Sequence, residues 1–190
     1  MAKKHIYILA FITLFGFGAM GLFTLNWVSD VLPIEIIDLH TPVYLQLFFG
    51  VATGFISAYI ALYLIESKLI RPSSKKYIDL IQGLNLNRME IVILSFCAGF
   101  GEEILFRACM QHYFGIWITA IVFVAIHGYL SPKDWRIFIY GFIMIGIIAA
   151  FGYLYDEYKI IPPAIAHFIF DVILLWRLSK KEISENYEEQ

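Results

Sequence analysis

Three apolar stretches of this sequence carry ionisable side chains at spacings that could do chemistry: CAGFGEEILFRACM (97–110), FVAIH (123–127) and AHFIFD (166–171). In chain order these side chains are Glu102, Glu103, Arg107, His127, His167 and Asp171. Carboxylates and imidazoles serve as general bases, proton donors and metal ligands. Because ionisable groups are costly inside an apolar segment, their presence indicates a functional site.

The two adjacent glutamates differ in how well their charge is matched. Glu103 lies four residues before Arg107, on one helix face and in the orientation that favours an ion pair. This pair can be architectural or can act directly in chemistry, and the local match favours architecture. Glu102 lies about 100° from Glu103 around a helix, so it is the less well matched carboxylate. Since a charge at the bilayer centre costs about 2.5–3.5 kcal/mol on insertion scales, we favour a functional role for Glu102.

The histidines fall on two further helices. His127 lies one turn after Phe123, near the inner end of its span, and is explained equally well by a helix–helix hydrogen bond and by function. His167 and Asp171 are four residues apart and stack on one helix face. Counting about 1.5 Å per residue from the outer ends places Glu102, His127, His167 and Asp171 at overlapping depths. We therefore expect one shared polar cavity.

The composition describes the elements that must position these residues. Of 190 residues, 60% are hydrophobic and 16% are charged, which predicts a polytopic membrane protein rather than a soluble domain. We expect an all-α bundle forming one integral-membrane domain, 1–190, with about six transmembrane helices. The predicted spans are 5–28, 43–65, 89–111, 114–129, 135–155 and 160–178. The first apolar run is too long for a signal peptide and is interpreted as a retained span.

The segment between the second and third predicted spans differs in composition. It begins with basic residues around Pro72 and continues with apolar residues at helical spacing, which predicts a short loop and an amphipathic helix on the membrane surface. Those apolar residues are Tyr77, Ile78, Leu80, Ile81 and Leu84. Five glycines in the spans are expected to be close-packing points between helices, namely Gly99, Gly101, Gly141, Gly146 and Gly152.

The distribution of Lys and Arg predicts the orientation in the bilayer. Of the 14 such residues, all lie on the same side as the N-terminus except Arg107, inside a span, and Lys159. The positive-inside rule therefore predicts that both termini are cytoplasmic, with 179–190 as a cytoplasmic tail. No basic cluster indicates nucleic-acid binding.

Read together, the three motifs have a familiar order. They form EExxxR (Glu102, Glu103, Arg107), FxxxH (Phe123, His127) and HxxxD (His167, Asp171). This pattern resembles the CPBP family of intramembrane proteases, also called the CAAX prenyl protease 2 or Abi family, whose eukaryotic members remove the C-terminal residues of prenylated CAAX proteins. The resemblance covers a catalytic core at 88–178, and the first two spans carry no family motif.

The resemblance implies a role for each residue. Glu102 would be the general base on a water molecule, His127 would hold and polarise that water, and His167 with Asp171 would stabilise the oxyanion. Glu103 would belong to the catalytic group. Several family members carry Asn at the position of Asp171; an amide can donate, whereas an ionised Asp can only accept. Asp171 can instead orient His167 and favour its imidazolium form, or be protonated itself.

The same donor types raise the question of a metal. Two histidines and a glutamate are a common zinc set, and here the ligands would be Glu102, His127 and His167. The HExxH spacing of soluble zinc proteases is absent, and the resemblance points to a metal-independent glutamate mechanism. We expect no tightly bound metal, with zinc as the leading alternative.

The sequence thus predicts an intramembrane endopeptidase that hydrolyses a membrane-associated peptide or protein in a bacterial cytoplasmic membrane. Prokaryotes generally lack prenylation, so peptide pheromones, bacteriocin leaders or membrane-protein segments are better candidate substrates than CAAX tails. The alternative is a non-proteolytic protein: a proton-coupled carrier, or a scaffold or regulator in bacteriocin immunity or sensor-kinase modulation. A carrier would be expected to repeat its broken helices in the N-terminal half. Since the first two spans contain no Asp, Glu, Lys or Arg, the carrier is disfavoured and the scaffold is not.

Overall fold

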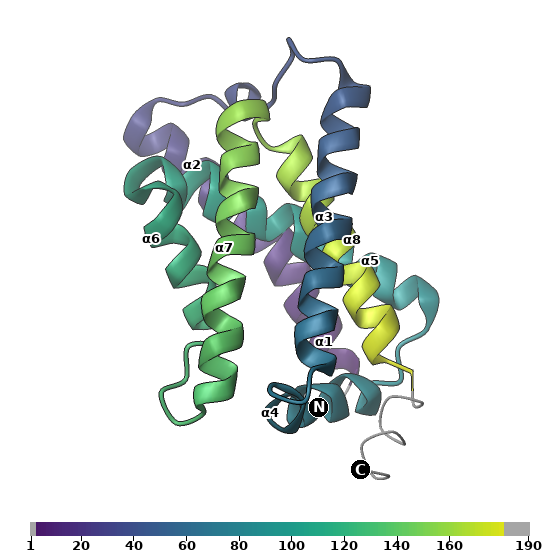
Figure 1. Ribbon diagram of the computed structural model, residues 1–190. Coiled ribbons are helices and arrows are strands. Elements are labelled where there is room, and N and C mark those ends of the chain that lie inside the picture. Colours follow the sequence, from purple (N-terminus) through teal and green to yellow (C-terminus); the bar gives the residue numbers. More distant parts are fainter. Residues whose placement is uncertain (1–2, 181–190) are drawn as a thin grey trace.

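The computed structural model describes residues 3–180 and is a bundle of helices (Figure 1). The elements are α1 (Lys3–Phe11), η1 (Ile12–Phe17), α2 (Gly18–Ser29), η2 (Pro33–Ile36), α3 (Val43–Glu66), α4 (Arg71–Gly83), α5 (Arg88–Glu103), η3 (Ile104–Met110), α6 (Gln111–Ile126), α7 (Trp135–Tyr158) and α8 (Ile161–Leu178). The predicted all-α membrane bundle is confirmed. Most of the predicted tail, from 181 to 190, lies outside the described residues.

The six predicted spans fall in five helical segments. Within residues 3–180, five helical segments are long and apolar enough to cross a membrane. They are Lys3–Ser29, Val43–Glu66, Arg88–Ile126, Trp135–Tyr158 and Ile161–Leu178. The spans predicted at 89–111 and 114–129 fall in one segment, Arg88–Ile126, because α5, η3 and α6 follow one another without a loop. The chain changes direction inside it at Gly115, whose φ of 75° is a conformation that glycine adopts at little cost.

Helix α8 lies at the centre, between α3 and α5, because small residues let the backbones approach. A Cβ on Gly99 of α5 would lie 2.8 Å from the Phe168 amide nitrogen of α8, and one on Gly54 of α3 would overlap the Ala166 carbonyl. Gly101 is even closer to the backbone of Thr13 in η1. These contacts bring α5 and α8 together at the depth of Glu103 and His167.

The predicted role of the glycines therefore holds with one exception. Gly141 lies against the Tyr129 carbonyl, and Gly152 lies against Gln111 and Ile116. The prediction for Gly146 is wrong, since a Cβ there would meet nothing within 4 Å.

The predicted amphipathic helix is present as α4, but it does not lie free on the membrane surface. Its Ile78 is only 1% exposed and packs into the main hydrophobic cluster with Ile65 and Ile70, while Leu80 stays exposed. The Ser73 hydroxyl donates to Asp134 just before α7, at 2.9 Å. Helix α4 thus covers the end of the bundle at which the N-terminus also lies (Figure 1).

Candidate active site

The two adjacent glutamates end helix α5 and point to different surroundings. Glu103 is the last residue of α5, and the π-helix η3 that follows contains Arg107. π-Helical turns are rare and often occur at functional sites. The Glu103 and Arg107 side chains are fully buried, and Arg107 Nε donates to Glu103 Oε2 at 2.9 Å. The ion pair predicted from the spacing is therefore present.

Glu103 also holds a histidine of another helix. Its Oε1 accepts a hydrogen bond from His167 Nδ1 at 2.9 Å, so one carboxylate joins Arg107 of η3 to His167 of α8. Because a carboxylate only accepts, Nδ1 carries the proton. The other ring nitrogen, Nε2, lies 3.7 Å from Asp171 Oδ2. The expected stacking of His167 on Asp171 is observed.

His127 is positioned by the end of helix α6. Gly128 follows with φ 79°, its amide donates to the Ala125 carbonyl and the Tyr129 amide donates to Val124, the two bonds of a Schellman motif. His127 Nδ1 lies 2.7 Å from the Phe123 carbonyl oxygen and donates to it. In the neutral ring this leaves a lone pair on Nε2, which is 3.7 Å from Glu102 Oε2.

Phe123 explains why the FxxxH motif contains an aromatic residue. Its ring stacks on the His127 imidazole at 4.4 Å between centroids and meets His167 edge-on at 5.8 Å. The Arg107 guanidinium lies 5.7 Å from the centroid of the same ring. Phe123 therefore lies between the two imidazole rings and holds both in position by packing against them.

A cavity of about 250 Å³ joins the separate motifs. It is bordered by Glu102, His127, His167 and Asp171, but not by Glu103, which lies behind His167. Within residues 3–180, Glu102 Oε2 is a buried oxygen without a hydrogen-bond partner. The shared polar cavity expected from the four depths exists, and it contains an unpaired carboxylate oxygen.

Three tyrosines also border the cavity, and the sequence reasoning missed them. The ring of Tyr129 lies 5.2 Å from Tyr140, 5.8 Å from Tyr77 and 6.2 Å from His127. By sequence alone, tyrosines near span ends are typical of a membrane-interface belt. The HGY triplet could have located Tyr129, because a glycine in the left-handed conformation turns the next residue back over the helix end.

The zinc set named above is not assembled. In the part of the chain that the structure describes, no group of three or more His, Cys, Asp or Glu side chains is arranged to hold a metal ion. Both histidines use Nδ1 in hydrogen bonds, to Glu103 and to the Phe123 carbonyl. These bonds leave Nε2 of each histidine without a hydrogen bond, and no step below passes through a metal.

Comparison with known proteins finds a family to which this part of the chain is similar. Residues 85–173 match the family described as type II CAAX prenyl endopeptidase Rce1-like. This segment is similar to that family and makes up just under half of the chain. The resemblance seen in the motifs is confirmed, since the matched residues include all of the motifs from Glu102 to Asp171. The matched family is one of endopeptidases, and the apolar helices are those of a multi-pass membrane protein.

A relative was found among curated proteins. The protein named "Uncharacterized protein YpbD" from Bacillus subtilis (strain 168) is 28% identical over 102 residues, which are 53% of this chain and 51% of YpbD. The chain thus spans about half the length of the relative that it matches. No solved structure matches it.

Proposed function

We propose that this protein is an intramembrane endopeptidase in which Glu102 activates water against a peptide bond of a membrane-associated substrate. One observation carries the proposal: residues from α5, the end of α6 and α8 line a single cavity in which Glu102 Oε2 has no hydrogen-bond partner. An unpaired buried carboxylate is costly for stability. A role in proton transfer explains why it is there.

The first step is the attack of water. His127 Nε2 and Glu102 Oε2 are 3.7 Å apart, too far for a direct hydrogen bond and close enough for one water to contact both. Glu102 takes a proton from that water as the water oxygen attacks the carbonyl carbon. The carbonyl π electrons move onto the carbonyl oxygen. A positioned base of this kind typically contributes about 10²–10⁴ in rate.

The second requirement is a donor for the oxyanion. His167 is held through Nδ1 by Glu103, which leaves Nε2 to face the cavity. In the imidazolium form Nε2–H donates to the developing oxyanion, and the nearby Asp171 carboxylate favours that form. When the intermediate collapses, the C–N bond breaks and its electron pair stays on nitrogen. The amine then takes the proton from Glu102.

Glu103 is proposed as a positioning residue rather than a catalytic one. It is fully buried, paired with Arg107, and separated from the cavity by His167. The sequence motifs alone group both glutamates together, whereas the geometry supports different roles. Glu102 faces the reacting atoms, and Glu103 fixes the ring that stabilises them.

The test compares the turnover of quenched fluorogenic peptides by detergent-purified wild type and Glu102→Gln, with and without a chelator. Glu102→Gln keeps the shape of the side chain and removes the base, so turnover should fall at least 100-fold, at about the lower end of the range for a lost general base. The matched control is Glu157→Gln on the exposed face of α7, which should retain full turnover. Equal turnover in wild type and Glu102→Gln would reject the mechanism, and loss on chelation would restore the metal alternative.

We also propose that the termini face the cytoplasm of a bacterial cell. The N-terminus, α4 and the end of α8 lie at one end of the bundle (Figure 1), and Lys and Arg gather in those segments. Labelling of a cysteine introduced at exposed Lys76 should be blocked in intact cells and occur after lysis. Labelling in intact cells would reverse the orientation.

A further inference from the structure

The cavity continues beyond its four ionisable residues as a chamber with apolar walls. Helices α4, α7 and α8 each turn one side-chain stripe toward it. On α7 the stripe is Tyr140, Met144 and Ile148, one turn apart; on α4 it includes Ile78 and Ile81. The chamber walls are therefore formed mainly by helix faces.

The polar groups lie at one end of this space. Along α8 the lining residues are first His167 and Asp171 and then Leu174, Leu175 and Leu178. At about 1.5 Å per residue, the leucines extend the wall about 10 Å beyond Asp171. The apolar part thus runs from the proposed reaction centre toward α4.

The volume limits what the chamber can hold. An apolar cavity of about 150 Å³ accommodates benzene. Scaling from that ratio, the whole space of about 250 Å³ holds about ten heavy atoms. The scissile peptide group needs about four of them, which leaves about six for a side chain. This is room for Leu, Ile or Met, at about four heavy atoms each, and is close to the size of Phe, at about seven. A long lipid chain exceeds this space.

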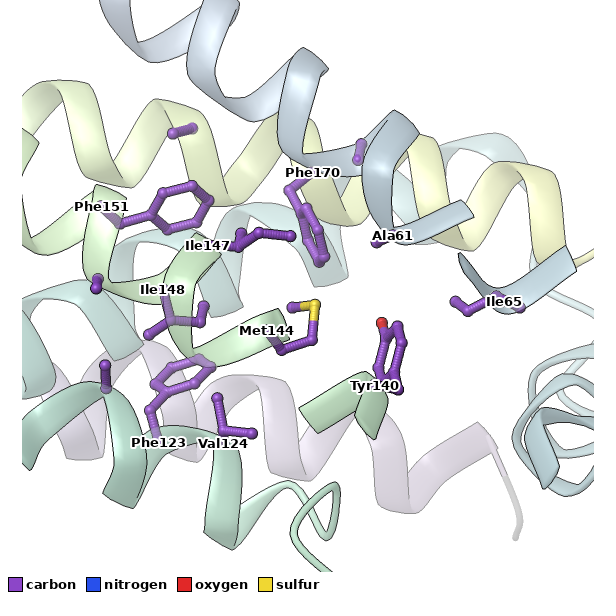
Figure 2. Packing of buried hydrophobic residues seen from close by; sticks show 14 of the residues in the cluster. Ala61, Ile65, Phe123, Val124, Tyr140, Met144, Ile147, Ile148, Phe151 and Phe170 are labelled. Carbon is purple, nitrogen blue, oxygen red and sulfur yellow. The ribbon is translucent and has the colours of Figure 1, made fainter. Parts of the chain in front are cut away.

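Met144 is placed to set this limit. It is buried, and Figure 2 shows it between Phe170 and Tyr140, with the Tyr140 hydroxyl directed toward the same space. Its unbranched, flexible side chain can adapt to residues of slightly different shape. We propose that the chamber binds one unmodified Leu, Ile, Met or Phe side chain next to the scissile bond, and that Met144 determines which of these fits. This inference rests on the proposed protease function.

The experiment measures kcat/KM for a set of quenched peptides that differ only at one position beside the cleaved bond, using the full-length protein in detergent. The wild type should prefer Leu, Met and Phe over Gly by about tenfold or more, as expected for an apolar pocket. Met144→Phe should reduce use of the Phe peptide relative to the Ala peptide. Met144→Ala should raise the relative use of a Trp peptide.

The matched control is Ile147→Ala. Ile147 is buried on the same helix and does not border the cavity, so this variant should keep the wild-type preference. Active Met144 variants with the wild-type preference would overturn the inference, as would cleavage confined to a peptide with an isoprenylated cysteine; both results leave the protease function standing. Absence of cleavage by folded wild type for every peptide would reject the function and the inference together.

Discussion

Replacing Gly99 by Ala should disturb the candidate site through a backbone contact. The new Cβ would lie 2.8 Å from the Phe168 amide nitrogen and 3.0 Å from the Ala164 carbonyl oxygen, whereas ordinary contacts begin at 3.4 Å. Because both neighbours are backbone atoms, no side chain can rotate away. Helices α5 and α8 must therefore separate by about 0.6 Å, at a typical overpacking cost of about 1–3 kcal/mol.

Helices α5 and α8 would separate next to the contact that positions His167 in the candidate site. Gly99 lies one turn before Glu103, and Phe168 is next to His167, so the 2.9 Å hydrogen bond between Glu103 and His167 lies in the strained region. A misplacement approaching 1 Å costs up to about 100-fold in rate. We expect Gly99→Ala to lower both the unfolding temperature and peptide turnover, with turnover reduced about 10- to 100-fold.

Gly146→Ala is the matched control for this prediction. A Cβ at Gly146 meets nothing within 4 Å, so the same substitution adds a methyl group without a clash. Its stability should be unchanged or raised by up to about 1 kcal/mol, because Ala is the better helix former. If Gly99→Ala matched Gly146→Ala in both thermal unfolding and turnover, the reasoning that close α5–α8 packing positions His167 would be refuted.

Two further predictions concern charge. Arg107→Ala removes the ion-pair partner of the fully buried Glu103 and should cost about 3–5 kcal/mol in unfolding free energy. Arg177→Ala, in an exposed pair, should cost about 1 kcal/mol or less in the same assay. Similar losses would contradict the assignment of a buried pair. Burial raises the pKa of Asp134, but hydrogen bonds from the Ser73 hydroxyl and two amides of α7 outweigh it, so the pKa lies below the usual 3.8. A carboxylate with a lowered pKa stabilises the fold at pH values above its unfolded-state pKa, and this stabilisation is lost as the pH falls through its folded-state pKa. The difference in melting temperature between wild type and Asp134→Asn should therefore shrink on acidification from pH 7 to about pH 3. A constant difference would show that the carboxylate charge does not matter.

Local spacing predicted the parts of the site that lie within one helix. The four-residue separations give the pair between Glu103 and Arg107 and the approach of His167 to Asp171. These features depend only on helical geometry, which the apolar runs already indicate. The membrane bundle followed from composition alone, because so apolar a chain cannot remain soluble.

Contacts between helices could not be obtained in this way. The bond from His167 to Glu103 crosses 64 residues of sequence and depends on how closely α5 approaches α8. The packing of α4 against the bundle was missed because an amphipathic stripe fits a membrane surface and a protein surface equally well. The two predicted spans at 89–111 and 114–129 are continuous in one helical segment because the chain turns at Gly115 without a polar loop to mark the boundary.

The central claim is that Glu102 is the base of a peptidase, and the turnover of Glu102→Gln beside wild type tests it most directly. Both proteins should elute and unfold alike, since the substitution keeps the size of a side chain whose Oε2 has no hydrogen-bond partner among the described residues. We predict peptide cleavage by wild type and a loss of at least about 100-fold in the variant. Cleavage at the wild-type rate by a folded Glu102→Gln protein would contradict the account.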